Sequence, residues 1–324
     1  MVIALFGPTG VGKTAVAVSV ATRLEVRVLS CDSMQIYRGF PILTNQPSAA
    51  ERAAAPHLFV GVANSAEEWS AAQYGDKARA AISEDLAGHR RALVAGGTGL
   101  WMRAALAPLA IPRAHDPALR ERLRRRAAEE GPAVLHAELA ALDPQAATRI
   151  HPANGPRVVR ALEVTLSLGP GAWADRADLW DPEYDHPTLL VGLTMERAEL
   201  KGRIDRRTCR MLAQGAVEEV RRDREDRVSR PRTAAAGSGR TGPAGVRGVA
   251  RAIGYQEIAG YLEGRLPLDE VASCMATATR HYARRQLTWM RRLKDAVIIH
   301  ASGRDPDDVA AQIVQLAADK EQAD

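Results

Sequence analysis

The sequence predicts an α/β protein: a doubly wound parallel sheet of the P-loop NTPase type, carrying a helical insertion domain. Short apolar runs alternate with helix-periodic stretches, which is typical of βαβ units. The octet GPTGVGKT directly follows the first apolar run, where a strand would pass into a helix. A long charged segment without strand-like runs interrupts the alternation, and its 3.6-residue periodicity predicts inserted helices.

The apolar runs expected to form strands are 2–6, 26–32, 91–97, 188–193 and, near the end of the chain, 296–300. Helical stretches such as 13–24 and 70–88 lie between them. In a doubly wound sheet, ligands bind outside the carboxyl ends of the strands. We therefore expect functional residues directly after the strands, at 7–14, 32–35 and 96–100.

The domain organisation follows from where strand-like runs are missing. Residues 113–183 carry only charged, helix-periodic sequence, so we expect a helical insertion between 1–112 and 184–324, which together form the core and end in a helical tail. Residues 227–249 are rich in Gly, Ala, Arg and Pro and hold few residues to bury, which predicts a flexible loop within the core.

The composition of the chain indicates the cellular compartment in which we expect the protein. The 324 residues are 46% hydrophobic, enough for a substantial core. No stretch approaches the roughly 18 apolar residues of a membrane span, and the first residues lack the charged region of a signal peptide. The cysteines, Cys31, Cys209 and Cys274, show no metal-type pairing. We expect a cytoplasmic protein with unpaired, buried thiols.

Basic residues gather in the second two-thirds of the chain, although the net charge is only +5. Solvated helix faces explain the stretches at 120–126 and 221–232 as well as a ligand does. The stretch 280–294 differs because it is interleaved with Tyr282 and Trp289 in a chain with only 4% aromatic residues. Cations for phosphates and flat rings for bases predict single-stranded RNA as a partner.

The octet at residues 7–14 matches the phosphate-binding pattern G-x-x-x-x-G-K-[ST] without a mismatch. Gly7, Gly10 and Gly12 let backbone amides face an anion, and the following helix N-terminus adds partial positive charge. Lys13 supplies a mobile cation, and Thr14 supplies a hydroxyl suited to Mg²⁺. The pattern predicts a polyphosphate ligand and leaves its identity open.

Two further motifs follow expected strands. Asp32, in SCDSMQIYRG (30–39), fits a helix cap, a Mg²⁺ ligand or a general base equally well. The turn GGTGLWMRAAL (96–106) opens onto a helix, and by itself this is a weak signal because many strand-to-helix turns look alike.

Taken together in their order, these blocks resemble the tRNA dimethylallyltransferases, also called tRNA isopentenyltransferases. The resemblance runs from residue 2 to about 292, through GPTGVGKT (7–14), SCDSMQIYRG (30–39), APHLFVGV (55–62), GGTGLWMRAAL (96–106), RIHPANGPRVVRALEV (149–164), RAIGYQEIAGYLEG (251–264) and RRQLTWMR (284–291).

The resemblance implies a Mg²⁺-dependent transfer of a dimethylallyl group from dimethylallyl diphosphate to the exocyclic amine of the adenosine 3′ of the tRNA anticodon. Asp32 would accept the amine proton, with Lys13 and Thr98 as further catalytic residues. Thr14 would contact the metal. The loop holding the diphosphate would comprise Gly7, Pro8, Thr9, Gly10, Val11, Gly12, Lys13 and Thr14. Arg203 or Arg207, one helical turn apart, could add an arginine, and surface cations explain them equally well.

The resemblance also implies contacts to the tRNA anticodon stem-loop, with the helical insertion gripping the anticodon arm. The expected contact residues are Asp32, Ser33, Met34, Gln35, Thr98, Arg120, Pro156, Arg157, Val158, Val159, Arg160, Arg251, Gly254, Tyr255, Gln256, Arg284, Arg285, Gln286, Trp289 and Arg291. No feature of the sequence requires a dimer, so we expect a monomer without a membrane partner.

Some positions depart from the family pattern. Where the family usually carries Gly-Thr-x-Lys-Pro, this chain has LTNQP, with Leu43 for glycine and Gln46 for lysine. Residues 169–176 replace a usual glycine-lysine-proline segment, and 227–249 is longer than expected. These departures bear on how the tRNA is held.

Two other functions use the same motifs. A small-molecule kinase would use the loop, a nearby aspartate and arginines to move a γ-phosphoryl group, with no need for the aromatic-basic tail. A nucleotide-switched RNA-binding protein would need a sensor of hydrolysis, and the sequence contains none that we recognise.

Overall fold

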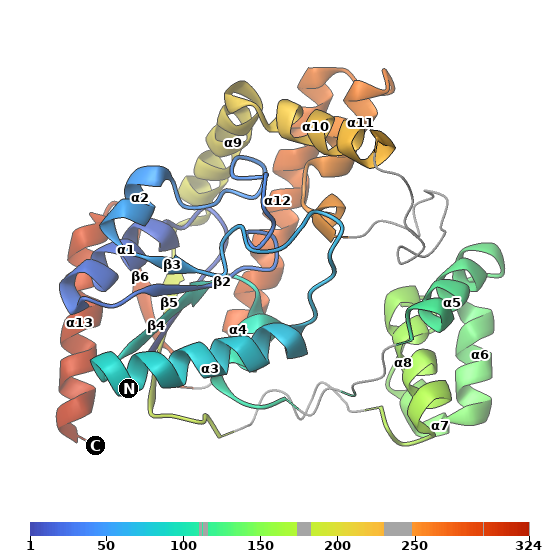
Figure 1. The fold of residues 1–324 in the computed structure, drawn as a ribbon, viewed down its shortest axis with the longest axis horizontal. Coiled ribbons are helices and arrows are strands. Elements are labelled where there is room, and N and C mark those ends of the chain that lie inside the picture. The colour runs from blue at the N-terminus through green and yellow to red at the C-terminus, as the bar shows by residue number, and fades with distance from the viewer. Residues whose placement is uncertain (110–111, 113–115, 174–182, 230–247, 294, 324) are drawn as a thin grey trace. The chain divides into compact units, whose positions relative to one another are not determined.

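The computed structural model describes the chain except for residues 110–111, 113–115, 174–182, 230–247, 294 and 324. The chain divides into two compact units (Figure 1). The first comprises Met1–Pro108, Glu183–Ser229 and Arg247–Asp324, and the second comprises Leu109–Pro182 with Arg230–Val246.

The first unit is built on a six-stranded parallel sheet with strand order β3-β2-β4-β1-β5-β6. The strands are β1 (Val2–Phe6), β2 (Val28–Cys31), β3 (His57–Leu58), β4 (Ala92–Gly96), β5 (Thr188–Thr194) and β6 (Val297–His300). The predicted fold class is confirmed. The short edge strand β3 was missed, because two residues show no periodicity that a sequence could reveal.

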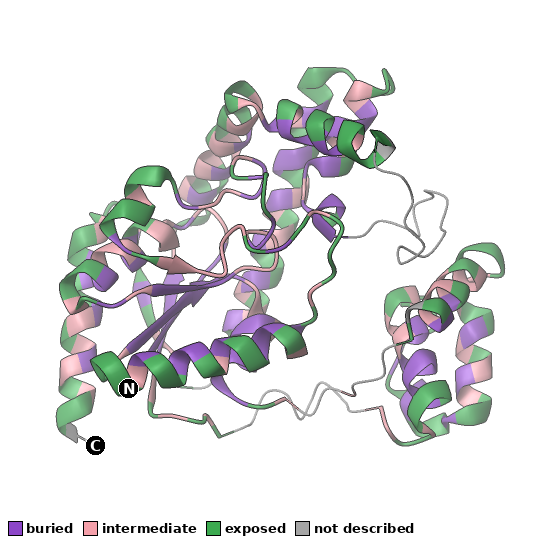
Figure 2. Cartoon of the chain, viewed as in Figure 1, coloured by how far each residue is buried: buried purple, intermediate pink, exposed green. Residues whose placement is uncertain are grey.

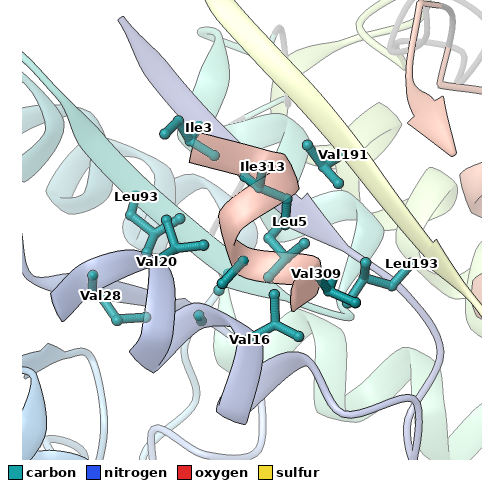
Figure 3. Close-up of a cluster of buried hydrophobic side chains, with 14 of the residues drawn as sticks. Ile3, Leu5, Val16, Val20, Val28, Leu93, Val191, Leu193, Val309 and Ile313 are labelled. Atoms are coloured by element: carbon teal, nitrogen blue, oxygen red, sulfur yellow. The ribbon is translucent and has the colours of Figure 1, made fainter. Parts of the chain in front are cut away.

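Both faces of the central strands β1, β4 and β5 are buried, so these strands are nearly continuous apolar runs (Figure 2). Successive side chains of a strand point to opposite faces. Ile3 and Leu5 of β1 pack with α1 (Lys13–Leu24) and α13 (Pro306–Ala323), as Figure 3 shows. Helices α3 (Ala71–His89) and α4 (Gly99–Leu106) contact the strands as well as each other.

Helix α13 is anchored by Val309 and Ile313, which are 1% and 0% exposed. Burying such side chains is worth about 1.5–3 kcal/mol each. The start of α3 illustrates a local signal: Ser70 and Gln73 form a capping box, in which each side chain bonds the backbone of the other. The expected helices 13–24 and 70–88 therefore end within one residue of their expected limits.

The remaining helices of the first unit follow the chain. They are α2 (Ala49–Ala54), α9 (Arg197–Gln214), α10 (Ala216–Ser229), the 3₁₀ turn η3 (Gly248–Arg251), α11 (Tyr255–Leu262) and α12 (Leu268–Met290). The expected loop 227–249 is corrected at both ends, because 227–229 complete α10 and 248–249 belong to η3. The rest of that expectation lies outside the described residues.

The second unit contains four helices among its described residues: α5 (Pro117–Glu129), α6 (Pro132–Leu142), α7 (Pro144–Thr148) and α8 (Gly155–Leu168). It has a core of its own, in which Leu123, Leu135, Leu139 and Leu162 are fully or almost fully buried. Proline stands in the first turn of each helix, where its missing N–H has no helical partner to lose.

Within the described residues, no helix combines the length and apolar character needed to cross a membrane. All three cysteines are free, but only Cys31 is buried, so the expectation of buried thiols is wrong for Cys209 and Cys274. Both lie on helices that bury other residues, such as Thr208 beside Cys209 and Met275 beside Cys274.

Candidate functional site

The loop after β1 has the backbone of an anion cradle. Gly10 and Gly12 have φ angles of 90° and 103°, which an L side chain rarely adopts, and α1 begins at the next residue, Lys13. The loop thus presents a helix N-terminus and its unpaired N–H groups at the carboxyl edge of the sheet.

Lys13 folds back onto this loop. Its Nζ donates to the carbonyls of Gly7 and Pro8 at 2.8 and 2.9 Å. Burial lowers the pKa of Lys13 to about 8, against the opposing effect of the Asp32 carboxylate. An anion entering the cradle would favour the charged ammonium and draw it from the two carbonyls.

Asp32 directly follows β2 and lies in a turn rather than at a helix start, so the helix-cap interpretation is wrong. One carboxylate oxygen, Oδ1, accepts the N–H of Met34 at 2.9 Å. The neighbouring Ser33 N–H donates to Thr98 Oγ1 at 3.2 Å. The expected clusters after β2 and β4 therefore meet, as parallel strand ends should.

A cavity of about 270 Å³ joins these elements. Its walls include Lys13, Thr14, Asp32 and Arg207, so a carboxylate faces the same space as the cationic cradle. Sequence reasoning missed Glu51 and His57 at this cavity, because neither belongs to a phosphate-binding pattern.

The structure distinguishes the two candidate arginines. Arg207 lines the cavity, and its Nη2 donates to Thr9 Oγ1 at 2.7 Å. Burial lowers the pKa of Arg207, as expected for a cation withdrawn from water. Arg203 pairs with Glu199 at 3.0 Å and does not line the cavity. Of the two arginines, Arg207 is therefore the one that lines the cavity.

Gln286 of α12 also lines the cavity, although the resemblance placed it among the RNA contacts. It is 3% exposed, and both ends of its amide bond backbone groups of the site. Tyr282, one turn earlier, is hydrogen-bonded to Thr98, and burial raises its pKa. The Gln286 amide and the Tyr282 hydroxyl are thus both engaged within the protein.

Residues expected to contact RNA divide by exposure. Arg251, Gln256, Arg284, Arg285 and Arg291 are exposed in the first unit, and Pro156 is exposed in the second. Val158, Val159, Gly254, Tyr255 and Gln286 are buried. Tyr255 donates to the buried Asp223 at 2.6 Å. The buried members stabilise helices, because a contiguous block on a helix places some side chains inward.

In the second unit, Arg120 and Arg160 share one buried carboxylate. Arg120 Nε and Arg160 Nη1 each donate to Glu163 Oε2 at 2.8 Å, and Glu163 is 0% exposed. Arg157 is half-buried on the same helix. Glu163 thereby fixes both guanidinium groups on the surface of this unit, a role that the sequence pattern did not reveal.

The LTNQP departure has a structural role here. Gln46 Nε2 donates to the carbonyls of Gln35 and Tyr37 at 2.9 and 2.7 Å, so it holds the turn after Asp32.

The buried Glu219 accepts the N–H groups of Ile42 and Leu43, both at 2.8 Å. Glu219 was missed because its partners lie far away in the sequence.

The donor set suits Mg²⁺ carried by a phosphate ligand. The Thr14 hydroxyl lines the cavity, whereas the described residues contain no cluster of three His, Cys, Asp or Glu side chains that could form a metal cage. Mg²⁺ commonly keeps several waters and binds through one or two protein oxygens plus substrate phosphates. Thr14 therefore fits as the protein contact of such an ion.

The fold and the site define a P-loop-like α/β enzyme whose phosphate cradle faces a carboxylate. The family model described as IPP transferase matches residues 35–293, and that described as isopentenyl transferase matches residues 1–61. The chain belongs to this family, the tRNA dimethylallyltransferases, which are prenyltransferases.

The sequences of named relatives align with almost the whole of this chain. The tRNA dimethylallyltransferase of Thermomicrobium roseum is 42% identical over 294 residues, covering 90% of this chain and 84% of the relative. That of Anaeromyxobacter dehalogenans is 41% identical over 312 residues, covering 95% and 97%.

Solved structures show the same fold. The tRNA isopentenylpyrophosphate transferase of Bacillus halodurans has a TM-score of 0.69 and 32% identity, covering 99% of this chain and 97% of that one. A eukaryotic dimethylallyltransferase acting on tRNA has a TM-score of 0.77 and 25% identity, covering 98% and 77%.

Proposed function

We propose that this chain transfers the dimethylallyl group of dimethylallyl diphosphate to the exocyclic amine of the adenosine 3′-adjacent to the anticodon of tRNA. Diphosphate is released. The observation that carries the proposal is the single cavity lined by the phosphate loop, Arg207 and Asp32. The relatives' names and the eukaryotic structure acting on tRNA support the choice of reaction and substrate.

Asp32 acts as the general base. The lone pair of an adenine amine is delocalised into the ring, so the nitrogen becomes a useful nucleophile only as its proton leaves. As the nitrogen bonds the first carbon of the donor, the proton passes to the carboxylate of Asp32 and the carbon–oxygen bond breaks. Such base catalysis is typically worth about 10² to 10⁴ in rate.

The cradle stabilises the leaving group. The electron pair of the broken bond remains on the diphosphate, so negative charge develops against the loop amides, Lys13 and Arg207. These fixed charges stabilise the transition state more than the ground state. Thr14 would hold Mg²⁺, and the ion would supply further charge neutralisation when bound.

The exposed arginines of α12 and the half-buried arginines of the insertion supply cations for the tRNA backbone. The reacting base has to leave its stack to reach a half-enclosed cavity, and unpaired loop bases do so at lower cost than paired ones. We place this reaction in the cytoplasm and assign it to the monomer.

The direct test is incubation of the purified protein with an anticodon stem-loop, dimethylallyl diphosphate and Mg²⁺, followed by mass analysis of the RNA. We expect an adenosine heavier by one dimethylallyl group and one released diphosphate per product. ATP consumption without prenylated RNA would instead favour the kinase.

The variant Asp32→Ala tests the role of Asp32 as the general base. We expect both substrates to bind normally while turnover falls at least about 10²-fold. Asp226→Ala is the matched control, because Asp226 is an exposed aspartate of α10 outside the cavity. Loss of diphosphate binding in Asp32→Ala would show that Asp32 is a metal ligand and not the base.

A further inference from the structure

We propose that Gln286 is a positioning residue for the transfer: it sets the separation between the phosphate loop and the turn that carries Thr98. This inference rests on the proposed function. It replaces the role of Gln286 as an RNA contact with one inside the protein.

The amide of Gln286 matches its two partners in both chemistry and placement. Oε1 accepts the N–H of Thr9 at 2.7 Å, and Nε2 donates to the carbonyl of Gly97 at 2.8 Å. A side-chain amide carries an acceptor and a donor side by side, so one residue can bridge an N–H and a C=O. With both ends bonded and only 3% of the residue exposed, the amide has little left for RNA.

The bridge depends on a close approach. A Cβ placed on Gly97 would lie 2.1 Å from Gln286 Nε2, far inside van der Waals contact. The glycine therefore admits the amide against the backbone after β4. Gly97 of GGTGLW therefore serves the seating of α12.

Thr9 is held from two helices at once. Gln286 of α12 bonds its N–H, and Arg207 of α9 donates to its Oγ1 at 2.7 Å. A loop residue fixed by both its backbone and its side chain has little freedom to shift. The position of the cradle is thus set by side chains that come from outside the phosphate-binding pattern.

The Gly97 end of the Gln286 bridge leads to Asp32, the proposed general base. Gly97 adjoins Thr98, whose Oγ1 accepts the Ser33 N–H at 3.2 Å, and Ser33 adjoins Asp32. The route runs from the donor cradle through Gln286 to the carboxylate that takes the proton. Because transfer needs the donor carbon and the amine at near-attack distance, a shift of about 1 Å can cost on the order of 10² in rate.

Gln286→Leu and Gln286→Glu test the proposal, with Gln315→Leu as the matched control. Gln315 is exposed on α13 and does not line the cavity, and its amide donates to Asp319 of the same helix at 2.7 Å. Each variant is assayed for the single-turnover rate per competent site at saturating stem-loop and donor, for RNA affinity, and for melting temperature.

For Gln286→Leu, we expect the saturated single-turnover rate to fall about 10²-fold while RNA affinity stays within about 2-fold. Gln286→Glu keeps the acceptor for Thr9 but loses the donor to Gly97 and places a carboxylate against that carbonyl, so its rate should also fall. Gln315→Leu should leave both the rate and the RNA affinity nearly unchanged.

A saturated rate equal to wild type in Gln286→Leu, accompanied by weaker RNA binding, would overturn the positioning role. If Gln286→Leu fails to fold, Gln286→Glu decides on the same two readouts. A wild-type protein that prenylates no RNA would overturn the proposed function instead, so the two failures are distinguishable.

Discussion

Replacement of Gly99 by alanine tests the packing of α12 against the first residue of α4 and the turn that precedes it. A Cβ at Gly99 would lie 2.2, 2.7 and 3.0 Å from three ring atoms of Trp289. Ordinary carbon contacts are about 3.5–4.0 Å, so the indole would have to retreat by more than about 1 Å. The ring is rigid and half-buried, which leaves α12 or the turn to absorb the shift.

Overpacking of this kind costs about 1–3 kcal/mol of unfolding free energy. Because Gly97 and Thr98 immediately precede Gly99, the same displacement should disturb the site. We expect Gly99→Ala to lower both stability and the saturated transfer rate, the latter by up to roughly 10²-fold. Denaturant unfolding and single-turnover assays measure the two effects.

Gly88→Ala is the matched control, because nothing lies within 4 Å of a Cβ at this position in α3. The same chemical change there should raise stability by about 0.5–1 kcal/mol, since alanine restricts the unfolded chain and favours helix. Gly99→Ala with wild-type stability and rate would refute the close approach of Trp289. Relief of the lost stability by Trp289→Leu in the double variant would support it.

Further predictions concern the charges and the loop at the site. Arg207→Ala should weaken binding of inorganic diphosphate by at least about 10-fold, and Arg203→Ala should do so less, which calorimetry can compare directly. With the pKa of Lys13 lowered to about 8 by burial, the free enzyme loses this cation as pH rises past 8, so kcat/KM for the donor should fall there; a flat profile to pH 9 would contradict this. Glu219→Ala leaves the N–H groups of two residues unpaired in a buried place and should destabilise the chain by about 1–3 kcal/mol for each in denaturant titrations.

Much of the fold could be predicted from the sequence. Buried parallel strands are short apolar runs, and the phosphate loop is contiguous, so residues 2–14 show both strand and cradle in one stretch. The position of Asp32 beside the loop also followed from the rule that parallel strands end at one edge. The choice among its possible roles did not follow from spacing, because spacing does not show what a carboxylate faces.

The sequence blocks expected to contact RNA show that a sequence pattern does not tell exposed residues from buried ones. Gln286 and Arg285 are neighbours in the sequence, yet one is buried and the other exposed. Successive helix residues point about 100° apart, and the faces buried are set by the elements packed around the helix. A block copied from a family therefore mixes residues that face a ligand with residues that hold the helix in place.

By itself, the sequence determined the parallel sheet, the phosphate cradle and the family, because each strand and each motif is a contiguous stretch whose pattern can be read without the contacts it makes. Only the tertiary structure decided that Arg207 rather than Arg203 lines the cavity and that Gln286 bonds Thr9. Those partners lie 198 and 277 positions from Thr9 along the chain. Their contacts arise from the packing of α9 and α12 onto the sheet, which no local spacing encodes.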